Sequence, residues 1–488
     1  MLVLAQVPRR LVLAALCTVL LLGQGVALAA PAAPAAPAPE PLPPVTNSDR
    51  HFGAAEAFRV QQTTLAQDAG VKWERVTMSW PQLDPGYWNG PWYLPFPYLD
   101  SQIAHDIDLV GMLINTPDAH STNLADGTTA VPAGLYLPVD DPNNSWAQFA
   151  RRTARFYHGR IFHWIIWNEP DITATDPNAA YRTWSGTVAD YYRLLKVGYL
   201  AVKEVDPTLT VGTAGFTYWT DARAGRRQYF DRMLDLVAQD PTAPAHNYYM
   251  DFVSLHLYSD PHSLYNVPVL YHQLMAARGF DKPIWINETN VIPWDDPVNA
   301  GTPRGSPGGM RATLDEQASF IVQAYALGLA AGVQRIEVYK MKDGDNDVVN
   351  GQALVRNLPT LQPRPEYVSY QLAATYFSHA KSATWFRQGQ VEEVVFDRGD
   401  QRVTALWNDS FASVRAQVHS SGGIARALDK YGQPAPLGIA APGVYALELP
   451  AATDHANLQT PNSAMIGGSP LLLIEDGSTV PPKETLLP

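Results

Sequence analysis

The sequence is poor in cysteine and in charge. It has one cysteine in 488 residues, and 17% of its residues are charged. A single cysteine excludes a disulfide framework, cysteine-rich zinc sites and iron–sulfur clusters. Basic residues are outnumbered: 35 Lys and Arg stand against 47 Asp and Glu, for a net charge of −12. Proteins that bind phosphate backbones usually carry a basic face, so nucleic acid and anionic membranes are disfavoured as partners. The 46% of apolar residues suffices for a large core and excludes wholesale disorder.

The N-terminal residues have the pattern of an export signal. Arg9 and Arg10 precede an apolar run from Leu11 to Leu22, and the small-residue site Ala27-Leu28-Ala29 follows. This arrangement predicts a signal peptide over residues 1–29 and a secreted, extracellular protein. The run is too short to cross a bilayer comfortably, so no stable membrane insertion is expected after cleavage. An uncleaved N-terminal anchor is the alternative.

Two further segments stand apart from the folded middle. Residues 30–48 alternate proline and alanine, which is typical of an extended, semi-rigid linker. Residues 451–488 lose periodicity and gain proline, glycine, serine and threonine. We expect them to form a loosely ordered C-terminal tail, in which Leu471 to Ile474 could dock onto the rest of the protein.

Short apolar runs alternate with helix-period segments from residue 51 onward. Ile321, Ala324, Tyr325 and Gly328, for example, share one helix face. Alternating strands and helices imply parallel strands with crossover helices, and this number of units over residues 49–381 favours an α/β fold of the closed (β/α)8 TIM-barrel type over an open sheet. An open sheet would be expected to carry a glycine-rich phosphate-binding loop, and the sequence contains none. The predicted strands are His51–Ala57, Trp73–Trp80, Leu109–Thr116, Ile161–Asn168, Thr208–Phe216, Asp251–Tyr258, Pro283–Thr289 and Gln334–Met341.

The pattern changes after a final helix at about residues 364–381. The following runs alternate with period 2 or are rich in β-branched residues, and glycine-containing turns separate them. We predict a small antiparallel, β-sandwich-like domain over residues 382–450, packed on the barrel. Its predicted strands are Val391–Asp397, Val403–Asn408, Val414–Val418 and Val444–Leu449.

Two glutamates end predicted barrel strands. Glu169 closes the fourth strand and Glu288 the seventh. Active-site residues of this fold lie at the C-terminal ends of strands, so both side chains should face one bowl. Two facing carboxylates can divide the roles of proton donor and ionised group, which is the chemistry that acetal hydrolysis requires. The alternative is that each glutamate pairs with a nearby arginine for stability.

Two motifs carry a resemblance to a known group of enzymes. Trp167-Asn168-Glu169-Pro170 resembles the Asn-Glu-Pro motif on strand 4 of glycoside hydrolase clan A, a group of retaining (β/α)8 glycosidases. Ile284-Trp285-Ile286-Asn287-Glu288 is similar to the clan's strand 7. The resemblance covers roughly residues 51–380, and the added β-domain is most like family 39 or family 5 enzymes. It implies that Glu169 is the general acid/base and Glu288 the nucleophile.

The resemblance also implies roles for neighbouring residues. Asn168 would donate to the sugar's 2-hydroxyl, and Arg75 on the second strand would lie close to the nucleophile. A cation there would keep Glu288 ionised. In the sixth strand, His256 and Tyr258 resemble the clan's histidine and tyrosine positions, with the tyrosine contacting the nucleophile. The alternatives are a core histidine at 256 and a buried pairing of Arg75 with another acid.

The eighth strand departs from the clan's pattern. Many members carry a tryptophan at its end as the floor of the sugar site, where this chain has Tyr339-Lys340. Tyr339 could stack on the sugar instead, or Lys340 could enter the pocket. The identity of the sugar, the linkage, exo or endo action and the oligomeric state stay open.

Aromatic residues near the strand ends are candidates for sugar stacking. Trp80 ends the second strand, and Trp88 lies in a glycine- and proline-rich loop over residues 84–93. Flat rings with polar tips suit the C–H faces of sugars. The alternative is that such residues merely cover the barrel rim.

The acidic loop Asp343-Gly344-Asp345-Asn346-Asp347 fails the EF-hand pattern, because Val348 and Leu354 stand where glycine and glutamate are needed. We expect a solvated polar loop there, or one that touches substrate hydroxyls, and no metal. The sequence as a whole predicts a secreted retaining glycoside hydrolase that acts on carbohydrate substrates without a cofactor. The alternatives are a non-catalytic carbohydrate-binding barrel and a transglycosylase.

Overall fold

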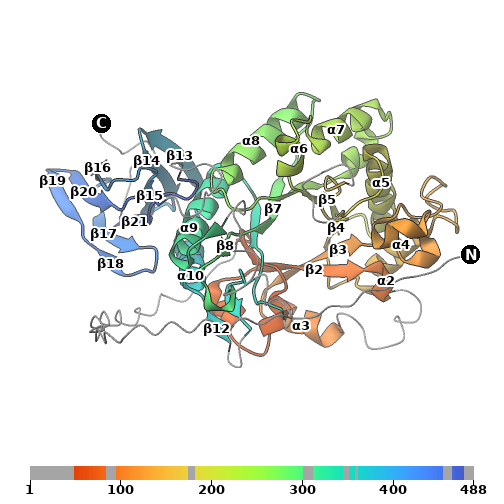
Figure 1. Ribbon diagram of the computed structural model, residues 1–488, viewed down its shortest axis with the longest axis horizontal. Helices are drawn as coiled ribbons and strands as arrows, with labels where there is room; N and C mark the ends of the chain where they lie inside the picture. Colours follow the sequence, from red (N-terminus) through yellow and green to blue (C-terminus); the bar gives the residue numbers. More distant parts are fainter. Residues whose placement is uncertain are drawn as a thin grey trace, which may run out of the picture. The chain divides into compact units, whose positions relative to one another are not determined.

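The structure is a computed structural model, and it describes residues 49–83, 95–173, 182–299, 311–344, 351–357, 361–453 and 464–477. All eight predicted barrel strands are present, and they close into a parallel barrel in the order β1-β10-β7-β6-β5-β4-β3-β2 (Figure 1). The predicted (β/α)8 barrel is therefore confirmed. The strands are β1 (Phe52–Ala54), β2 (Trp73–Ser79), β3 (Asp108–Ile114), β4 (His163–Ile166), β5 (Thr210–Phe216), β6 (Phe252–His256), β7 (Ile284–Thr289) and β10 (Arg335–Val338).

Helices surround the barrel, and their starts follow local sequence signals. Two of them begin with capping boxes, Thr187 with Asp190 at α5 and Thr313 with Glu316 at α9, which satisfy backbone N–H groups that have no partner within the helix. The helices are α1 (Leu65–Ala69), α2 (Trp80–Leu83), α3 (Phe96–Ala104), α4 (Ser145–Phe156), α5 (Val188–Val205), α6 (Trp219–Arg223), α7 (Tyr229–Gln239), α8 (Ser263–Ala276), α9 (Leu314–Ala330) and α10 (Pro365–Phe377).

Aromatic and aliphatic side chains fill the barrel interior at the N-terminal ends of the strands. Phe252 stacks on Trp285 with ring centroids 3.8 Å apart, and Trp73 lies 5.7 Å from Trp285. Gly53 leaves room for this packing, because a Cβ atom there would lie 2.4 Å from the Trp73 ring. We call this group the aromatic layer; its members are Trp73, Val110, Met112, Ile165, Phe252 and Trp285. It closes the barrel below the strand ends that carry the candidate site.

The C-terminal region forms the predicted antiparallel β-domain. One sheet has the order β13-β14-β15-β21-β17-β18 and the other β16-β20-β19. A buried apolar cluster that includes Leu406, Val418 and Leu447 lies between them, as in a sandwich. The strands are β13 (Ser382–Gln388), β14 (Val391–Asp397), β15 (Gln401–Asn408), β16 (Val414–His419), β17 (Ile424–Asp429), β18 (Pro434–Ala435), β19 (Gly438–Ala441), β20 (Val444–Leu449) and β21 (Leu471–Asp476).

The C-terminal tail expected after residue 451 contains one strand, β21, because Leu471 to Ile474 do dock onto the rest of the protein. This strand pairs with β15 on one side and β17 on the other, in the middle of the larger sheet. Its side chains alternate: Leu471 and Leu473 join the sandwich core, whereas Leu472 and Ile474 join the main core. A strand buried on both faces reads as a continuous apolar run, which explains why it showed no period-2 signal.

The β-domain packs against α9 and α10, beside which it is drawn in Figure 1. Phe377 of α10 stacks on Phe396 of β14 with ring centroids 4.3 Å apart. The buried Lys430 donates to the Asp315 carbonyl and to the Ser319 hydroxyl, both on α9, at 2.9 Å each. The two helices are therefore covered on one side by the barrel and on the other by the β-domain.

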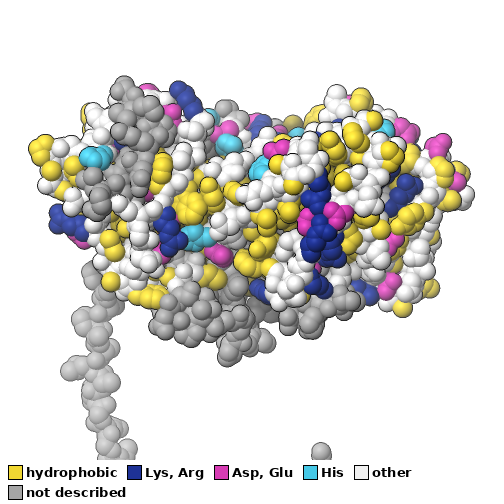
Figure 2. Space-filling view, turned by 90° about the horizontal axis from the view of Figure 1, so that it is seen from above, with side chains coloured by type: hydrophobic (Ala, Val, Ile, Leu, Met, Phe, Trp, Pro, Cys, Tyr) yellow, Lys and Arg dark blue, Asp and Glu magenta, His cyan; other side chains and the backbone are white. Residues whose placement is uncertain are grey.

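Short pairings outside the two main parts are β8 (Ile292–Pro293) with β9 (Arg311–Ala312), and β11 (Val355–Arg356) with β12 (Gln362–Pro363). Within the described ranges, no helix combines the length and the hydropathy that a bilayer crossing requires. On the face shown in Figure 2, basic and acidic side chains lie next to one another among apolar ones. Among the ion pairs of the described residues, Arg227 and Arg278 each pair with both Asp231 and Asp235.

Candidate active site

Glu169 lies directly after β4, on a backbone that bends sharply. Trp167 and Glu169 have φ angles of 76° and 46°, in the left-handed region that residues other than glycine rarely adopt. The Glu169 N–H donates to the Gly215 carbonyl at 3.2 Å, and its own carbonyl accepts from the Thr183 hydroxyl. Such backbone conformations persist only where neighbours fix them, and they concentrate at functional sites.

Glu288 lies near the end of β7 and is held by three side chains from β2 and from the end of β6. Arg75 Nη2 donates to its Oε1 at 2.5 Å, and the Tyr258 hydroxyl donates to its Oε2 at 2.6 Å. His256 Nδ1 lies 3.3 Å from the same Oε2. The predicted contacts of Arg75 and Tyr258 with Glu288 are thus present in the structure.

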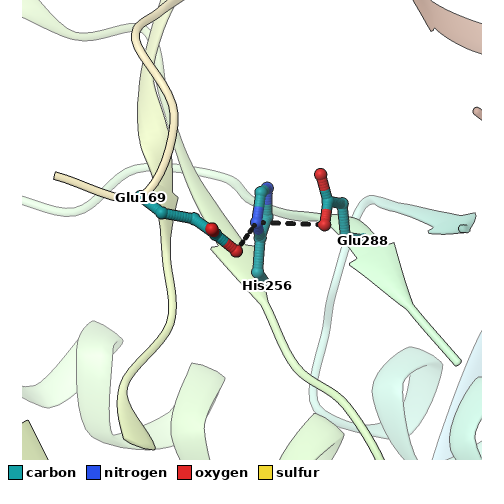
Figure 3. A group of neighbouring side chains, drawn as sticks. All are labelled: Glu169, His256 and Glu288. Atoms are coloured by element: carbon teal, nitrogen blue, oxygen red, sulfur yellow. Dashed lines mark hydrogen bonds and ion pairs between the residues drawn. The ribbon is translucent and has the colours of Figure 1, made fainter. Parts of the chain in front are cut away.

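His256 lies between the two carboxylates, as Figure 3 shows. Its Nδ1 is 2.8 Å from Glu169 Oε1, and its Nε2 is 3.2 Å from Arg75 Nη1. A guanidinium has only donors, so Nε2 must accept and Nδ1 must carry the hydrogen. The network therefore places the Nδ1–H of His256 toward both glutamates. Gly215 provides the space, because a Cβ atom there would lie 2.0 Å from the imidazole Nε2.

The surroundings of Glu288 favour its charged form. Burial raises its pKa, but His256, Arg75 and Tyr258 outweigh burial, and the net pKa is lowered. Burial, followed by the charge of Glu288, raises the pKa of Tyr258 well above its usual value. Tyr258 is therefore a protonated donor at any physiological pH, and Glu288 is an ionised acceptor.

A cavity of about 410 Å³ opens over the two carboxylates. One oxygen of Glu169, one oxygen of Glu288 and a nitrogen of His256 all lie within 4.8 Å of one another. Asn168, Tyr258 and Tyr339 also line the cavity, and Arg75 Nη1 lies 3.5 Å from Asn168 Oδ1. Five predicted site residues therefore line one cavity, with His256 and Arg75 beside them: Asn168, Glu169, Tyr258, Glu288 and Tyr339.

Among the described residues, Trp80 and Lys340 are not part of the lining of this cavity. Trp80 begins α2 rather than ending β2, and its buried ring stacks on Phe149 with centroids 4.8 Å apart. Trp88 lies outside the described residues. Lys340 is buried and approaches Glu56, with Nζ 3.8 Å from Oε2. Of the strand 8 pair, Tyr339 is the one that borders the cavity.

Sequence reasoning missed two polar residues that shape the site. Asn290 follows β7, lines the cavity and donates to the Tyr339 and Gln352 carbonyls at 3.2 and 2.6 Å. Its position just after a strand end was the available signal. Glu337 lies in β10 and accepts from the Arg75 backbone N–H at 2.7 Å. Nothing in its local sequence distinguishes it from an ordinary strand residue.

The site has the atom types of a metal centre, but other groups already satisfy them. Glu169, His256 and Glu288 could offer three ligand atoms. However, Nδ1 of His256 carries a hydrogen, and Arg75 already supplies positive charge to Glu288. In the acidic loop, Asp343 pairs with Arg364 at 2.7 Å, which gives it a structural role. Asp345 to Asp347 lie outside the described residues.

Comparisons with known proteins give a result for structure and none for sequence. No family model and no curated protein matches the chain. A family 39 glycoside hydrolase from the gut symbiont Bacteroides cellulosilyticus WH2 is similar with a TM-score of 0.61 at 14% identity, over 88% of this chain and 81% of that one. A GH30 endoxylanase from Clostridium papyrosolvens C71 is similar with a TM-score of 0.57 at 12% identity, over 88% of this chain and 98% of that one. A family 51 α-L-arabinofuranosidase from Bifidobacterium longum is similar with a TM-score of 0.55 at 13% identity, over 89% of this chain and 97% of that one. At these identities the likeness shows the fold, and at that level it agrees with the sequence resemblance.

Proposed function

We propose that the protein is a secreted glycoside hydrolase that cleaves O-glycosidic bonds of oligo- or polysaccharides with retention of configuration. The observation that carries the proposal is the meeting of Glu169 and Glu288 over one cavity, in unlike surroundings. Solved structures of glycoside hydrolases with the same fold support it. The export-signal pattern of residues 1–29 supports secretion.

In the first step, a carboxylate oxygen of Glu288 attacks the anomeric carbon while the bond to the leaving oxygen breaks. Glu169 transfers its proton to that oxygen, so the aglycone departs as a neutral alcohol. Arg75 and Tyr258 keep Glu288 ionised and correctly oriented for the attack. The product of this step is a glycosyl ester on Glu288 and an ionised Glu169.

In the second step, Glu169 removes a proton from water, and the water oxygen attacks the anomeric carbon. The ester bond breaks, Glu288 becomes ionised again and Glu169 regains its proton. The Nδ1–H of His256 lies 2.8 Å from Glu169 Oε1 and can stabilise the charge that Glu169 carries between the steps. The two glutamates supply every proton transfer.

The spacing of the two carboxyl groups favours retention. Retaining glycosidases hold them about 5–5.5 Å apart, whereas inverting enzymes hold them about 6.5–9.5 Å apart to admit a water. The oxygens of Glu169 and Glu288 that face each other lie within 4.8 Å. This closeness of the two carboxylates supports retention over inversion.

Trapping of the glycosyl ester tests the proposal. The protein is incubated with 2,4-dinitrophenyl 2-deoxy-2-fluoro-β-D-xyloside and with the corresponding glucoside, and intact mass and peptide mapping follow. We expect a covalent adduct on Glu288 that is absent from Glu288→Gln. Binding without an adduct would favour the carbohydrate-binding barrel instead. Turnover of natural glycans into longer products rather than into free sugar would favour the transglycosylase.

A further inference from the structure

A second buried acid lies beneath the nucleophile. Glu337 sits in the middle of β10, and its side chain is fully buried. The catalytic steps above do not use it. Buried acids in a barrel interior are costly unless hydrogen bonds or a counter-charge compensate them, so its contacts show what form it takes.

Glu337 has few partners for a carboxylate. The Arg75 backbone N–H donates to its Oε1 at 2.7 Å. Its Oε2 lies 3.8 Å from Arg75 Nε, beyond hydrogen-bond distance, and has no hydrogen-bond partner among the residues that the structure describes. One donor on one oxygen is poor solvation for a negative charge.

Glu288 and Glu337 both approach the Arg75 guanidinium, through different nitrogen atoms. Arg75 lies 2.5 Å from Glu288 Oε1 through Nη2 and 3.8 Å from Glu337 Oε2 through Nε. Glu288 also accepts from Tyr258 and faces the Nδ1–H of His256. When one cation serves two buried carboxyl groups, the better solvated group ionises and the other keeps its proton.

We propose that Glu337 is a positioning residue that works in its protonated form, fixing β2 at Arg75 while leaving the guanidinium charge to Glu288. This inference rests on the proposed function, because it concerns the ionisation of the nucleophile. A protonated Glu337 can hold the Arg75 backbone through Oε1 without competing for its side chain. The Oε2 atom that lacks a hydrogen bond to the described residues then belongs to a neutral group. Burying a neutral group without this hydrogen bond costs much less free energy than burying an anion without it.

The electrostatics of the surrounding elements agree with this assignment. Burial raises the pKa of Glu337 well above its usual range; Arg75 lowers it, whereas Glu288 and Glu74 raise it further. The other titratable groups that face Glu337 are Tyr325 of α9 and Tyr370 of α10, both with pKa values well above their usual range because they are buried. Neither tyrosine adds charge near Glu337 at neutral pH.

Two substitutions separate charge from position. Glu337→Gln is neutral and keeps an oxygen that can accept from the Arg75 N–H. Glu337→Leu removes that acceptor and leaves a buried N–H unpaired. If Glu337 is protonated in the native protein, the glutamine variant resembles the wild type. If Glu337 is ionised, glutamine removes a negative charge next to Arg75 and lowers the pKa of Glu288.

The readout is the rate of covalent labelling by 2,4-dinitrophenyl 2-deoxy-2-fluoro-β-D-xyloside between acid and neutral pH. Its leaving group needs no proton, so the acid limb reports the ionisation of Glu288. We expect Glu337→Gln to label within about 3-fold of the wild-type rate with an unmoved acid limb. We expect Glu337→Leu to label about 10-fold more slowly, with an acid limb about one pH unit higher, since a lost buried hydrogen bond is worth about 1–3 kcal/mol.

A spectroscopic measurement tests the proton without activity. Infrared spectra at neutral pH should contain the C=O band of a protonated carboxylic acid that is missing from Glu337→Gln. The inference is overturned if that difference is absent, if the glutamine variant's acid limb moves to lower pH, or if Glu337→Leu labels like the wild type. A wild-type protein that is labelled neither by this xyloside nor by the corresponding glucoside overturns the proposed function itself. Should Glu337→Leu fail to fold, as judged by circular dichroism, the infrared band and the glutamine profile still decide.

Discussion

The two ends of the barrel interior are built from different chemistry. At the N-terminal ends of the strands, the aromatic layer packs Trp73, Phe252 and Trp285 with centroid distances of 3.8 and 5.7 Å. Toward the C-terminal ends, the interior holds what we call the charged layer: Arg75, Glu169, His256, Glu288 and Glu337. Along the barrel axis, the interior therefore changes from apolar packing to a network of hydrogen bonds and ion pairs.

This difference separates stability from chemistry. Apolar contacts in the aromatic layer contribute to the free energy of folding in proportion to the buried area. Buried ion pairs contribute little net stability, because desolvation offsets their attraction. They do, however, fix which acid is ionised, and that is a requirement of catalysis. We therefore expect substitutions in the charged layer to change rates, and substitutions in the aromatic layer to change melting temperatures.

The largest effect is expected for Glu288→Gln. The amide keeps the shape and a hydrogen-bond acceptor but cannot form the glycosyl ester, so kcat/KM should fall about 10⁴-fold or more. Its melting temperature should fall less than that of Trp285→Ala. Steady-state kinetics on chromogenic glycosides and calorimetry measure the two quantities. As a control, Asp100→Asn alters an exposed acid that pairs with Arg160 and should leave kcat/KM unchanged.

The next effect is expected for Glu169→Ala, and it should depend on the leaving group. Glycosides of poorly acidic alcohols need the proton from Glu169, so their kcat/KM should fall about 10³-fold, within the usual range for general acid catalysis. With dinitrophenyl glycosides, the rate of the first step should fall only slightly. A parallel assay of both substrate types checks this dependence. Equal slowing of the two types would contradict the acid role of Glu169 and with it the division of labour within the charged layer.

Trp285→Ala probes the opposite layer. Removal of this buried ring should lower the free energy of unfolding by about 3–5 kcal/mol, as for other large-to-small core substitutions. The kcat of the folded protein should change less than in either glutamate variant. Urea unfolding with active-site titration measures both. The matched control is Trp294→Ala, which truncates a tryptophan that is 44% exposed and should cost much less stability.

The smallest effect is expected for Tyr258→Phe. The hydroxyl donates to Glu288 and helps to lower its pKa, so its loss should raise the acid limb of the kcat/KM profile by about one pH unit. The sign follows because Glu288 reacts as the anion, which is present only above its pKa. Tyr136→Phe removes an exposed hydroxyl that donates to Asp190 and should leave the profile in place. An unmoved limb in Tyr258→Phe would contradict the role of this donor.

The sequence predicted the barrel well because buried parallel strands are apolar runs with clear ends. Val391–Asp397 and Val444–Leu449 were likewise predicted with the bounds that β14 and β20 have in the structure. β19 was missed because it lies at a sheet edge and its residues are exposed, Ile439 at 78%. β17 lies between β21 and β18, and exposed residues such as Ile424, at 81%, hide its pattern. β21 was missed because both of its faces are buried, so it shows no period-2 alternation.

The candidate site was likewise predictable from the sequence only in part. Glu169 and Glu288 end strands, and the fold brings such positions together. The spacing of Arg75, His256 and Tyr258 from the carboxylates depends on how the side chains of different strands meet, for which only the resemblance gave a guide. Glu337 and the burial of Trp80 had no sequence signal, because both depend on which side of a strand or helix faces the interior.

The central position of β21 has a consequence for biosynthesis. β15 and β17 bond to each other only through this strand, and it is the last of the described strands to leave the ribosome. The nascent chain can close the barrel, from β1 to β10, well before the larger sheet of the β-domain can be assembled. Until then β15 and β17 have open edges, so a chain that stops before residue 471 would expose them to pairing with other molecules.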